Sequence, residues 1–184
     1  MTAIQSVHGR RVWDSRGNPT VEVDVTLETG VLGRAIAPSG ASRGKREAIE
    51  LRDGGTSLRG KGVASAVAKV NEVIAPALIG RDISDQSALD AALVALDPSP
   101  LKDTLGGNAV VATSLATLHA ASHNASLPLW RHIANRYATT PTIPLPEIQI
   151  FGGGAHAGRR VDIQDFMIMV PGASDFDEVM EVTN

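Results

Sequence analysis

The chain contains no cysteine, few aromatic residues and no long apolar run. Without cysteine there can be no disulfide, thiolate nucleophile or cysteine zinc site, and the composition fits a reducing cytoplasm. Aromatic residues make up only 3% of the chain, so platforms for stacking nucleic-acid bases are scarce. No apolar segment approaches the ~18 residues that a membrane span needs, and residues 1–10 lack the apolar core of a signal peptide. We therefore expect a cytoplasmic protein without a membrane span.

Charge and hydrophobicity are those of an ordinary folded protein. Hydrophobic residues form 43% and charged residues 20% of the 184 positions, which is enough for a core. The net charge of −3 argues against a general nucleic-acid binder. The length suits one domain, or one domain and part of another.

The N-terminal residues have the pattern of a three-stranded antiparallel meander. Residues 20–28 alternate strictly, with three valines and Leu27 on one side and mostly acidic residues on the other. A period of two predicts a strand with one buried face. Strand-like residues 3–14 precede this strand and residues 31–38 follow it, and the turns between them contain glycine.

About four helices are expected after the strands. Apolar residues from Val63 to Ile74 recur at helical spacing, and Pro76 lies just beyond the expected end of this first helix. Asp82 or Ser84 can cap a second helix, because both side chains accept hydrogen bonds from the free N–H groups of a helix start.

The helical pattern continues to about residue 137. The second helix ends at Asp97, residues 108–124 form an alanine-rich buried helix, and Pro128 suits the first turn of a fourth helix. Three histidines lie in or beside these helices. No carboxylate cluster accompanies them, so we interpret them as structural or surface residues and not as metal ligands. They are His119, His123 and His132.

A linker separates two parts of the chain. Residues 139–146 contain three of the ten prolines, which is typical of a domain junction. We assign residues 1–138 to an α+β N-terminal domain and residues 147–184 to the start of a second domain.

The second domain is expected to begin with two strands and a helix. Residues 145–151 and 161–170 read as strands, and Ser174 can cap a helix that starts near residue 175. Two strands and one helix cannot close a core, so we expect the remainder of this domain to belong to a longer chain.

Two segments have the composition of functional loops. Residues 39–47 combine small side chains, two glycines and three cations, which suits either an anion site or a solvated basic turn. Residues 152–167 hold a glycine triplet, His156, Gln164 and Asp165. They suit either an active-site lid with proton-handling side chains or a glycine-rich surface loop before a buried strand.

Six segments, in order along practically the whole chain, resemble enolase. They are SRGNPTVEV (15–23), PSGAS (38–42), EAIELRDG (47–54), GKGV (60–63), NA (108–109) and VDIQDFMI (161–168). The resemblance implies a three-stranded meander with helices, followed by an αβ barrel that is incomplete here. It also implies the glycolytic interconversion of 2-phosphoglycerate and phosphoenolpyruvate, with two Mg²⁺ ions that hold the doubly charged carboxylate formed during the reaction.

The resemblance implies roles for five residues. Ser42, with Ala41 beside it, matches the loop that closes over the substrate and coordinates the second Mg²⁺ through serine oxygens. His156 matches a second closing loop near the substrate phosphate, and Gln164 matches a substrate-contacting glutamine. Asp165 stands where the family has a glutamate of the acid group near the departing hydroxyl. His156 and Asp165 are therefore the candidate catalytic residues, and all five are candidate substrate-binding residues.

The remaining parts of the implied site lie outside this sequence. The lysine base, the main proton donor and the three carboxylates of the tighter Mg²⁺ site belong to later barrel strands of the family. We therefore expect the isolated chain to be inactive.

Several departures from the enolase pattern cluster at the implied site. Asp165 is one methylene shorter than glutamate, and Gln149 and Gly152 replace two asparagines. Arg43 replaces a threonine of the serine loop, and Gly107 replaces an alanine. Misplacing an acid by ~1 Å can lower a rate on the order of a hundredfold, so these changes leave room for a related substrate.

Three hypotheses follow. The first is an enolase-type lyase acting on a small phosphorylated carboxylic acid. The second is a diverged biosynthetic relative such as carboxyphosphonoenolpyruvate synthase. The third is a non-catalytic interaction or dimerisation domain. Enolases commonly dimerise, and the region of Arg16 and Glu22 resembles the family interface, so we expect a homodimer or higher homo-oligomer.

Overall fold

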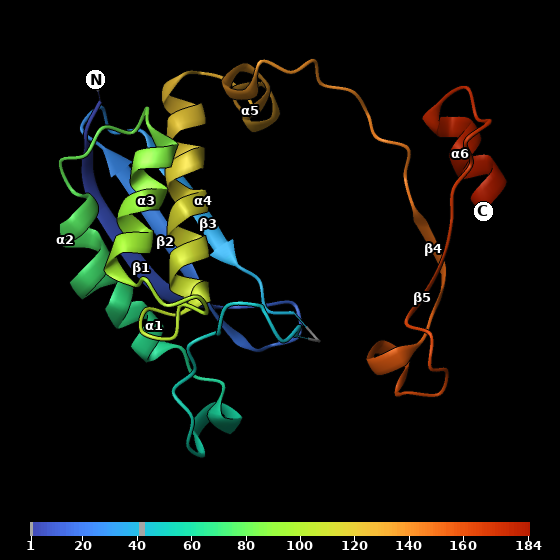
Figure 1. The fold of residues 1–184 in the computed structure, drawn as a ribbon, viewed down its shortest axis with the longest axis horizontal. Helices are drawn as coiled ribbons and strands as arrows, with labels where there is room; N and C mark the ends of the chain where they lie inside the picture. The colour runs from blue at the N-terminus through green and yellow to red at the C-terminus, as the bar shows by residue number, and fades with distance from the viewer. Residues whose placement is uncertain (1, 41–42) are drawn as a thin grey trace. The chain divides into compact units, whose positions relative to one another are not determined.

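The computed structural model describes residues 2–40 and 43–184, with side chains at all of these except Ala155 and His156. The chain divides into two compact units. The first contains the residues up to Gly40 together with Gly44–Thr139, and the second contains Thr140–Asn184 and, of the described residues before them, Arg43 (Figure 1). The two units are described separately below.

The first unit begins with the predicted meander. Strands β1 (Ile4–Trp13), β2 (Pro19–Leu27) and β3 (Leu32–Ala37) form an antiparallel sheet in the order β1-β2-β3. One face of β2 is fully buried, as its alternating pattern predicts. The buried side chains are Val21, Val23, Val25 and Leu27.

The opposite face of β2 carries charge, and it is also largely covered. Glu22 is only 8% exposed. Its carboxylate pairs with Arg10 of β1 at 2.5 Å, and Asp24 pairs with Arg34 of β3 at 2.6 Å. The polar face is thus covered by arginine side chains from both neighbouring strands.

The first helical segment is longer than predicted. It comprises α1 (Ala64–Lys69), a π-helical turn η2 (Val70–Ile74) and α2 (Ala75–Leu78). The prediction that Pro76 lies beyond this helix was wrong. The π turn resets the hydrogen-bond register just before Pro76, so the proline falls in the first turn of α2, where its missing N–H costs little.

Three further helices and one short turn complete the first unit. They are the 3₁₀ turn η1 (Ser57–Gly60), α3 (Gln86–Leu96), α4 (Gly107–Asn124) and α5 (Leu129–Tyr137).

The predicted cap of α3 was wrong. Asp85 caps the helix, because its Oδ1 accepts from the backbone N–H of Ala88 at 3.1 Å. Asp82 instead accepts from the N–H and hydroxyl of Ser84, at 3.2 and 2.8 Å, in a turn before the helix.

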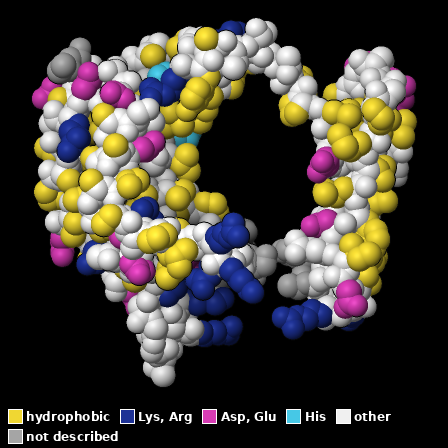
Figure 2. Space-filling view, viewed as in Figure 1, with side chains coloured by type: hydrophobic (Ala, Val, Ile, Leu, Met, Phe, Trp, Pro, Cys, Tyr) yellow, Lys and Arg dark blue, Asp and Glu magenta, His cyan; other side chains and the backbone are white. Residues whose placement is uncertain are grey.

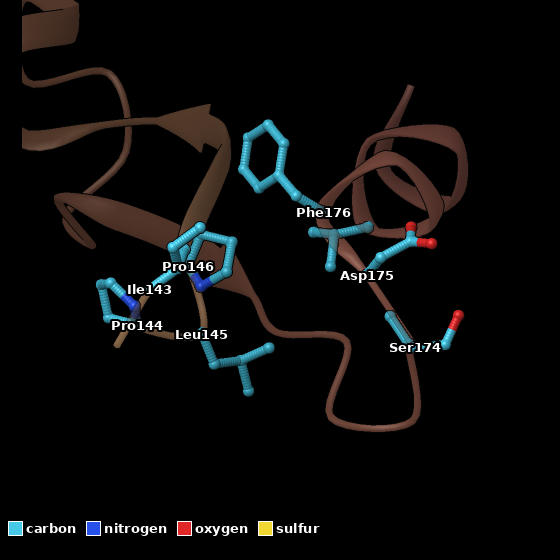
Figure 3. Close-up of a pocket in the computed structure, with 9 residues that line it drawn as sticks. Ile143, Pro144, Leu145, Pro146, Ser174, Asp175 and Phe176 are labelled. Carbon is cyan, nitrogen blue, oxygen red and sulfur yellow. The ribbon is translucent and has the colours of Figure 1, made fainter. Parts of the chain in front are cut away.

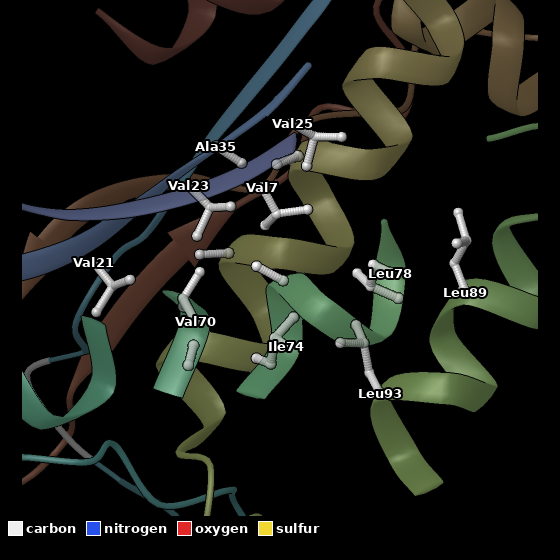
Figure 4. Close-up of a cluster of buried hydrophobic side chains, with 14 of the residues drawn as sticks. Val7, Val21, Val23, Val25, Ala35, Val70, Ile74, Leu78, Leu89 and Leu93 are labelled. Carbon is white, nitrogen blue, oxygen red and sulfur yellow. The ribbon is translucent and has the colours of Figure 1, made fainter. Parts of the chain in front are cut away.

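The core of the first unit lies between the sheet and the helices, which cover one face of the sheet in Figure 1. In Figure 4, valines of β2 face Val70 and Ile74 of η2. Helix α4 packs on β2 and β3 through a row of alanines that are 0% exposed, and these small side chains allow a close approach. The row consists of Ala109, Ala112, Ala116 and Ala120.

The second unit contains a β-hairpin and a short helix after the linker. Its elements are β4 (Ile148–Gly152), the 3₁₀ turn η3 (Gly154–Ala157), β5 (Asp165–Ile168) and α6 (Phe176–Thr183). Both predicted strands were too long. Pro146 lacks the N–H that strand pairing needs, and before β5 residues 161–162 form bends and residues 163–164 lie outside any strand.

The predicted cap of α6 was also wrong by one residue. Asp175 is the N-cap and accepts from the N–H of Glu178 at 2.9 Å. Ser174 instead donates its N–H and hydroxyl to the Glu178 carboxylate, at 2.7 and 2.8 Å.

Candidate functional site

The structure describes part of the predicted site. Ala41 and Ser42 lie outside the described residues, and so does the side chain of His156, whose backbone belongs to η3. Gln164 and Asp165 are described. Their neighbourhood on the β4–β5 hairpin is therefore the part of the site whose geometry can be followed.

A β-bulge decides which side chains share a face of this hairpin. Gly152 pairs with Asp165, but the register shifts between Gln149 and Phe151, so β4 has one residue more than β5 there. The bulge places Gln149 on the same face as Gly152 and Asp165. In a regular strand of the same sequence, Gln149 would lie on the opposite face. The opposite face carries Phe151 and Phe166, whose rings lie edge to face at 5.5 Å.

The Asp165 carboxylate is held by two glutamine amides. Gln149 donates its Nε2 to Oδ1 of Asp165 across the hairpin. Gln164 donates its Nε2 to Oδ2 at 3.1 Å. All three side chains are exposed in this unit, so the carboxylate is both oriented and open to a ligand.

The structure thus brings together two predicted site residues, Gln164 and Asp165, and adds a third residue. Sequence reasoning treated Gln149 only as a departure from a pattern. Its contact with Asp165 depends on the bulge, and no turn residue or proline marks that bulge in the sequence. The one sequence feature that could have pointed to this contact is that Gln149 precedes Gly152 by three residues.

The glycine triplet approaches the chain's own backbone. Gly153 donates its N–H to the carbonyl of Gln164 at 2.6 Å, and Gly154 donates to Val161 at 2.8 Å. A Cβ on Gly153 would lie 2.0 Å from the carbonyl oxygen of Ile163. This glycine is therefore needed for the η3 turn to fold back against residues 161–164.

Ser39 and Gly40, at the start of the basic segment, lie in the first unit beside a network of polar contacts. Arg16 donates to the carbonyl of Ser39 at 2.5 Å, and the Ser39 hydroxyl donates to Glu50 at 3.0 Å. Arg43 and Lys45 are exposed. Figure 2 shows Lys and Arg side chains gathered at this end of the unit. Anion binding by this segment stays a prediction.

The histidines of α4 make contacts that suit structural roles. The His123 ring nitrogen Nδ1 lies 2.8 Å from the carbonyl oxygen of Leu32, which joins α4 to β3. Burial, together with the nearby His123, lowers the pKa of His119. Among the described side chains, which do not include that of His156, no group of three or more His, Asp or Glu residues is placed to hold a metal ion. The described residues therefore do not by themselves fit a magnesium site.

A cavity of about 360 Å³ also lies within the second unit, between the linker and the start of α6 (Figure 3). Its walls are mainly apolar, with Leu145, Pro146 and Phe176 among them. The one carboxylate in its wall belongs to Asp175, which already caps α6. The cavity therefore lacks the charged groups that a phosphorylated substrate would need.

Two family models match the chain. Residues 4–133 match the model described as enolase, N-terminal domain, and residues 140–184 match enolase, C-terminal TIM barrel domain. The chain belongs to the enolase family. The predicted fold class is thereby confirmed, with a meander and helices in the N-terminal match and the β4–β5 hairpin in the barrel match.

Membership of the enolase family also supports a lyase-type enzyme of the enolase superfamily. In the portion of this enolase-family chain that the structure describes, no helix is both long enough and apolar enough to cross a membrane.

Proposed function

We propose that this enolase-family chain is part of a Mg²⁺-dependent lyase that interconverts 2-phosphoglycerate with phosphoenolpyruvate and water. The observation that carries the proposal is the exposed Asp165 carboxylate beside Gln164, within the segment that matches the enolase barrel. Elimination of water needs the departing hydroxyl to be held in place, and a carboxylate fixed by two amides is suited to accept a hydrogen bond from that hydroxyl.

Each candidate residue has a role that agrees with this reaction. Asp165 interacts with the departing hydroxyl, and Gln164 orients that carboxylate and contacts the substrate. His156 lies on a closing loop near the substrate phosphate, and Ala41 and Ser42 belong to the second closing loop. When bound, Mg²⁺ supplies the positive charge that stabilises the doubly charged carboxylate.

The metal ligands and the base come from other parts of the proposed full-length protein. The described residues offer no cluster of three metal-binding side chains, so Mg²⁺ dependence here is a property of the complete barrel. Ser42 is the residue of this chain that we assign to the second ion.

We further propose a cytoplasmic homodimer or larger homo-oligomer. The charged face of the sheet supports this, because Arg10 and Arg34 are held by Glu22 and Asp24, remain partly exposed and so present a fixed charge pattern to a partner. Arg16 is likewise fixed by the Ser39 carbonyl.

Activity of the purified full-length protein tests the main proposal. We expect phosphoenolpyruvate to form from 2-phosphoglycerate when Mg²⁺ is present, and the reaction to stop when a chelator removes the metal. A folded protein that binds Mg²⁺ yet turns over no 2-phosphoglycerate would contradict the proposal.

A diverged activity is the second candidate, on a related phosphorylated or phosphono carboxylic acid, as in carboxyphosphonoenolpyruvate synthase. The specific observation in its favour is that Gln149, Gly152 and Asp165, three departures from the enolase pattern, lie in contact. The variant Asp165→Glu separates the two candidates. A large gain in turnover of 2-phosphoglycerate supports divergence, and a loss indicates that Asp165 is tuned to that substrate.

A further inference from the structure

We infer that Gln149 is a positioning residue for the Asp165 carboxylate, and that Gly152 provides the space through which the Gln149 amide reaches it. This inference rests on the proposed function, because it concerns how the group near the departing hydroxyl is held. Gln149 itself need not touch the substrate.

The bulge is the first reason. β4 and β5 pair through Gly152 and Asp165, and again through Gln149 and Met167, with one extra residue of β4 in between. If β4 ran through the same residues as a regular strand, with no bulge, Gln149 would lie on the face of the two phenylalanine rings. Bulges re-aim single side chains in this way next to functional sites.

The space at Gly152 is the second reason. The φ of Gly152 is not in the left-handed region, so its backbone conformation does not demand glycine. A Cβ at this position would lie 3.3 Å from Nε2 of Gln149, which is closer than most real contacts of that kind. The absent side chain therefore leaves room for the amide to cross from β4 to Asp165.

The two amides together fix the carboxylate. Gln149 binds Oδ1 and Gln164 binds Oδ2, so rotation of the carboxylate would break one of the two hydrogen bonds. An ionised carboxylate accepts up to about four hydrogen bonds. The exposed Asp165 thus keeps acceptor sites for a substrate hydroxyl while its orientation is held.

The lengths of the side chains are complementary. Aspartate places its carboxylate one methylene closer to the backbone than glutamate, and glutamine extends its amide one methylene further than asparagine. The longer Gln149 side chain can therefore reach the Asp165 carboxylate, which lies closer to the β5 backbone than a glutamate carboxylate would. Three positions that depart separately from the enolase pattern act in this structure as one unit.

A double-mutant cycle in the full-length protein tests the coupling, with kcat and KM for 2-phosphoglycerate as readouts. Gln149→Met keeps the length of the side chain and removes its donor. We expect it to lower kcat about 10–100-fold, since displacement of a reacting group by ~1 Å has an effect of that size. KM should change much less. In an Asp165→Ala background the same change should alter kcat less than about twofold, the limit for uncoupled residues.

Equal losses in both backgrounds would overturn the inference. Gln5→Met makes the same chemical change at an exposed position of β1 and should leave kcat unchanged. Gly152→Ala should give a smaller drop in kcat, and that drop should vanish when Gln149 is already methionine. Thermal melting of each variant shows whether it has folded.

A readout without turnover separates the inference from the proposed function. In full-length protein labelled with ¹⁵N at glutamine side chains, Asp165→Ala and Gly152→Ala should each shift the Gln149 amide resonance. If wild type turns over no 2-phosphoglycerate but these shifts occur, the function fails and the positioning contact stands. An unshifted Gln149 resonance in Asp165→Ala overturns the contact itself.

Discussion

A Cβ atom on Gly33 would lie 2.3 Å from the carbonyl oxygen of Ala116. β3 and α4 therefore meet backbone to backbone at this point. Gly33→Ala must push the strand and the helix apart, and overpacking of this kind typically costs about 1–3 kcal/mol. We expect a loss of free energy of unfolding near the upper end of this range, measured by chemical denaturation.

Gly172 provides the matched control. A Cβ there would meet no heavy atom within 4 Å, and its φ is not left-handed. Gly172→Ala should change stability little or raise it slightly, by about 0.4–1 kcal/mol, because alanine restricts the unfolded chain. Equal destabilisation by both substitutions would show that contact with α4 is not the cause.

Asp97 should control the acid stability of the loop after α3. It is 1% exposed and accepts hydrogen bonds from the hydroxyl of Ser99 at 2.6 Å and from the N–H of Leu105 at 2.9 Å. These bonds and others from the same loop lower the pKa of Asp97 to about 2. The unfolded chain has a pKa of about 3.9 at such a group. The stabilisation is thus complete above about pH 4 and is lost as the pH falls toward 2.

Asp97→Asn tests this dependence. The amide places N–H groups against backbone donors, and an unsatisfied buried group costs about 1–3 kcal/mol. The variant should be less stable at pH 7 and should lose less further stability between pH 4 and 2, as followed by urea unfolding at each pH. An acid dependence identical to that of wild type would mean that Asp97 is not the group that titrates.

Asp24 should stabilise the sheet through two arginines. Arg34 binds it through Nε at 2.6 Å and Arg10 through Nη1 at 2.8 Å, and these contacts lower the pKa of Asp24 well below its usual range. Asp24→Asn leaves both cations without this partner. Arg34 is half exposed and Glu22 remains near both arginines, so we expect a loss of about 1–2 kcal/mol in thermal or chemical unfolding.

Glu28→Gln removes a negative charge from an exposed position just after the same strand and serves as the control. It should leave the free energy of unfolding nearly unchanged. If the two variants lose equal stability, net charge and not the arginine contacts is responsible.

Periodicity was enough to predict the elements of the first unit. Alternation along β2 identified the meander, and the alanine-rich run identified α4, because each pattern reflects burial in the core. The ends of elements were harder to predict. Aspartate is a favoured N-cap residue, so the sequence does not distinguish Asp82 from Asp85. In the structure Asp82 accepts from Ser84 in a turn before the helix, and Asp85 caps α3.

The contacts within the candidate site were not predictable from the sequence. Gln164 and Asp165 stood out through their resemblance to a family motif. The role of Gln149 depends on one extra residue in β4, and a strand with a bulge has the same composition as a strand without one. The register between β4 and β5 depends on how the two strands pair, and the pattern of residues within one strand does not reveal that pairing.

The isolated 184-residue chain should be inactive whatever the full-length protein does. In the second unit the hairpin exposes apolar side chains on both faces, with Phe151 51% and Met167 51% exposed. A two-stranded hairpin is marginally stable without a sheet or helix to cover it, so the orientation of Asp165 depends on the rest of a barrel. The described residues also hold no cluster able to bind Mg²⁺. We expect no formation of phosphoenolpyruvate by the purified chain with Mg²⁺, alongside turnover by the full-length protein in the same assay. Measurable turnover by the chain alone would mean that the base and the metal ligands lie within these residues.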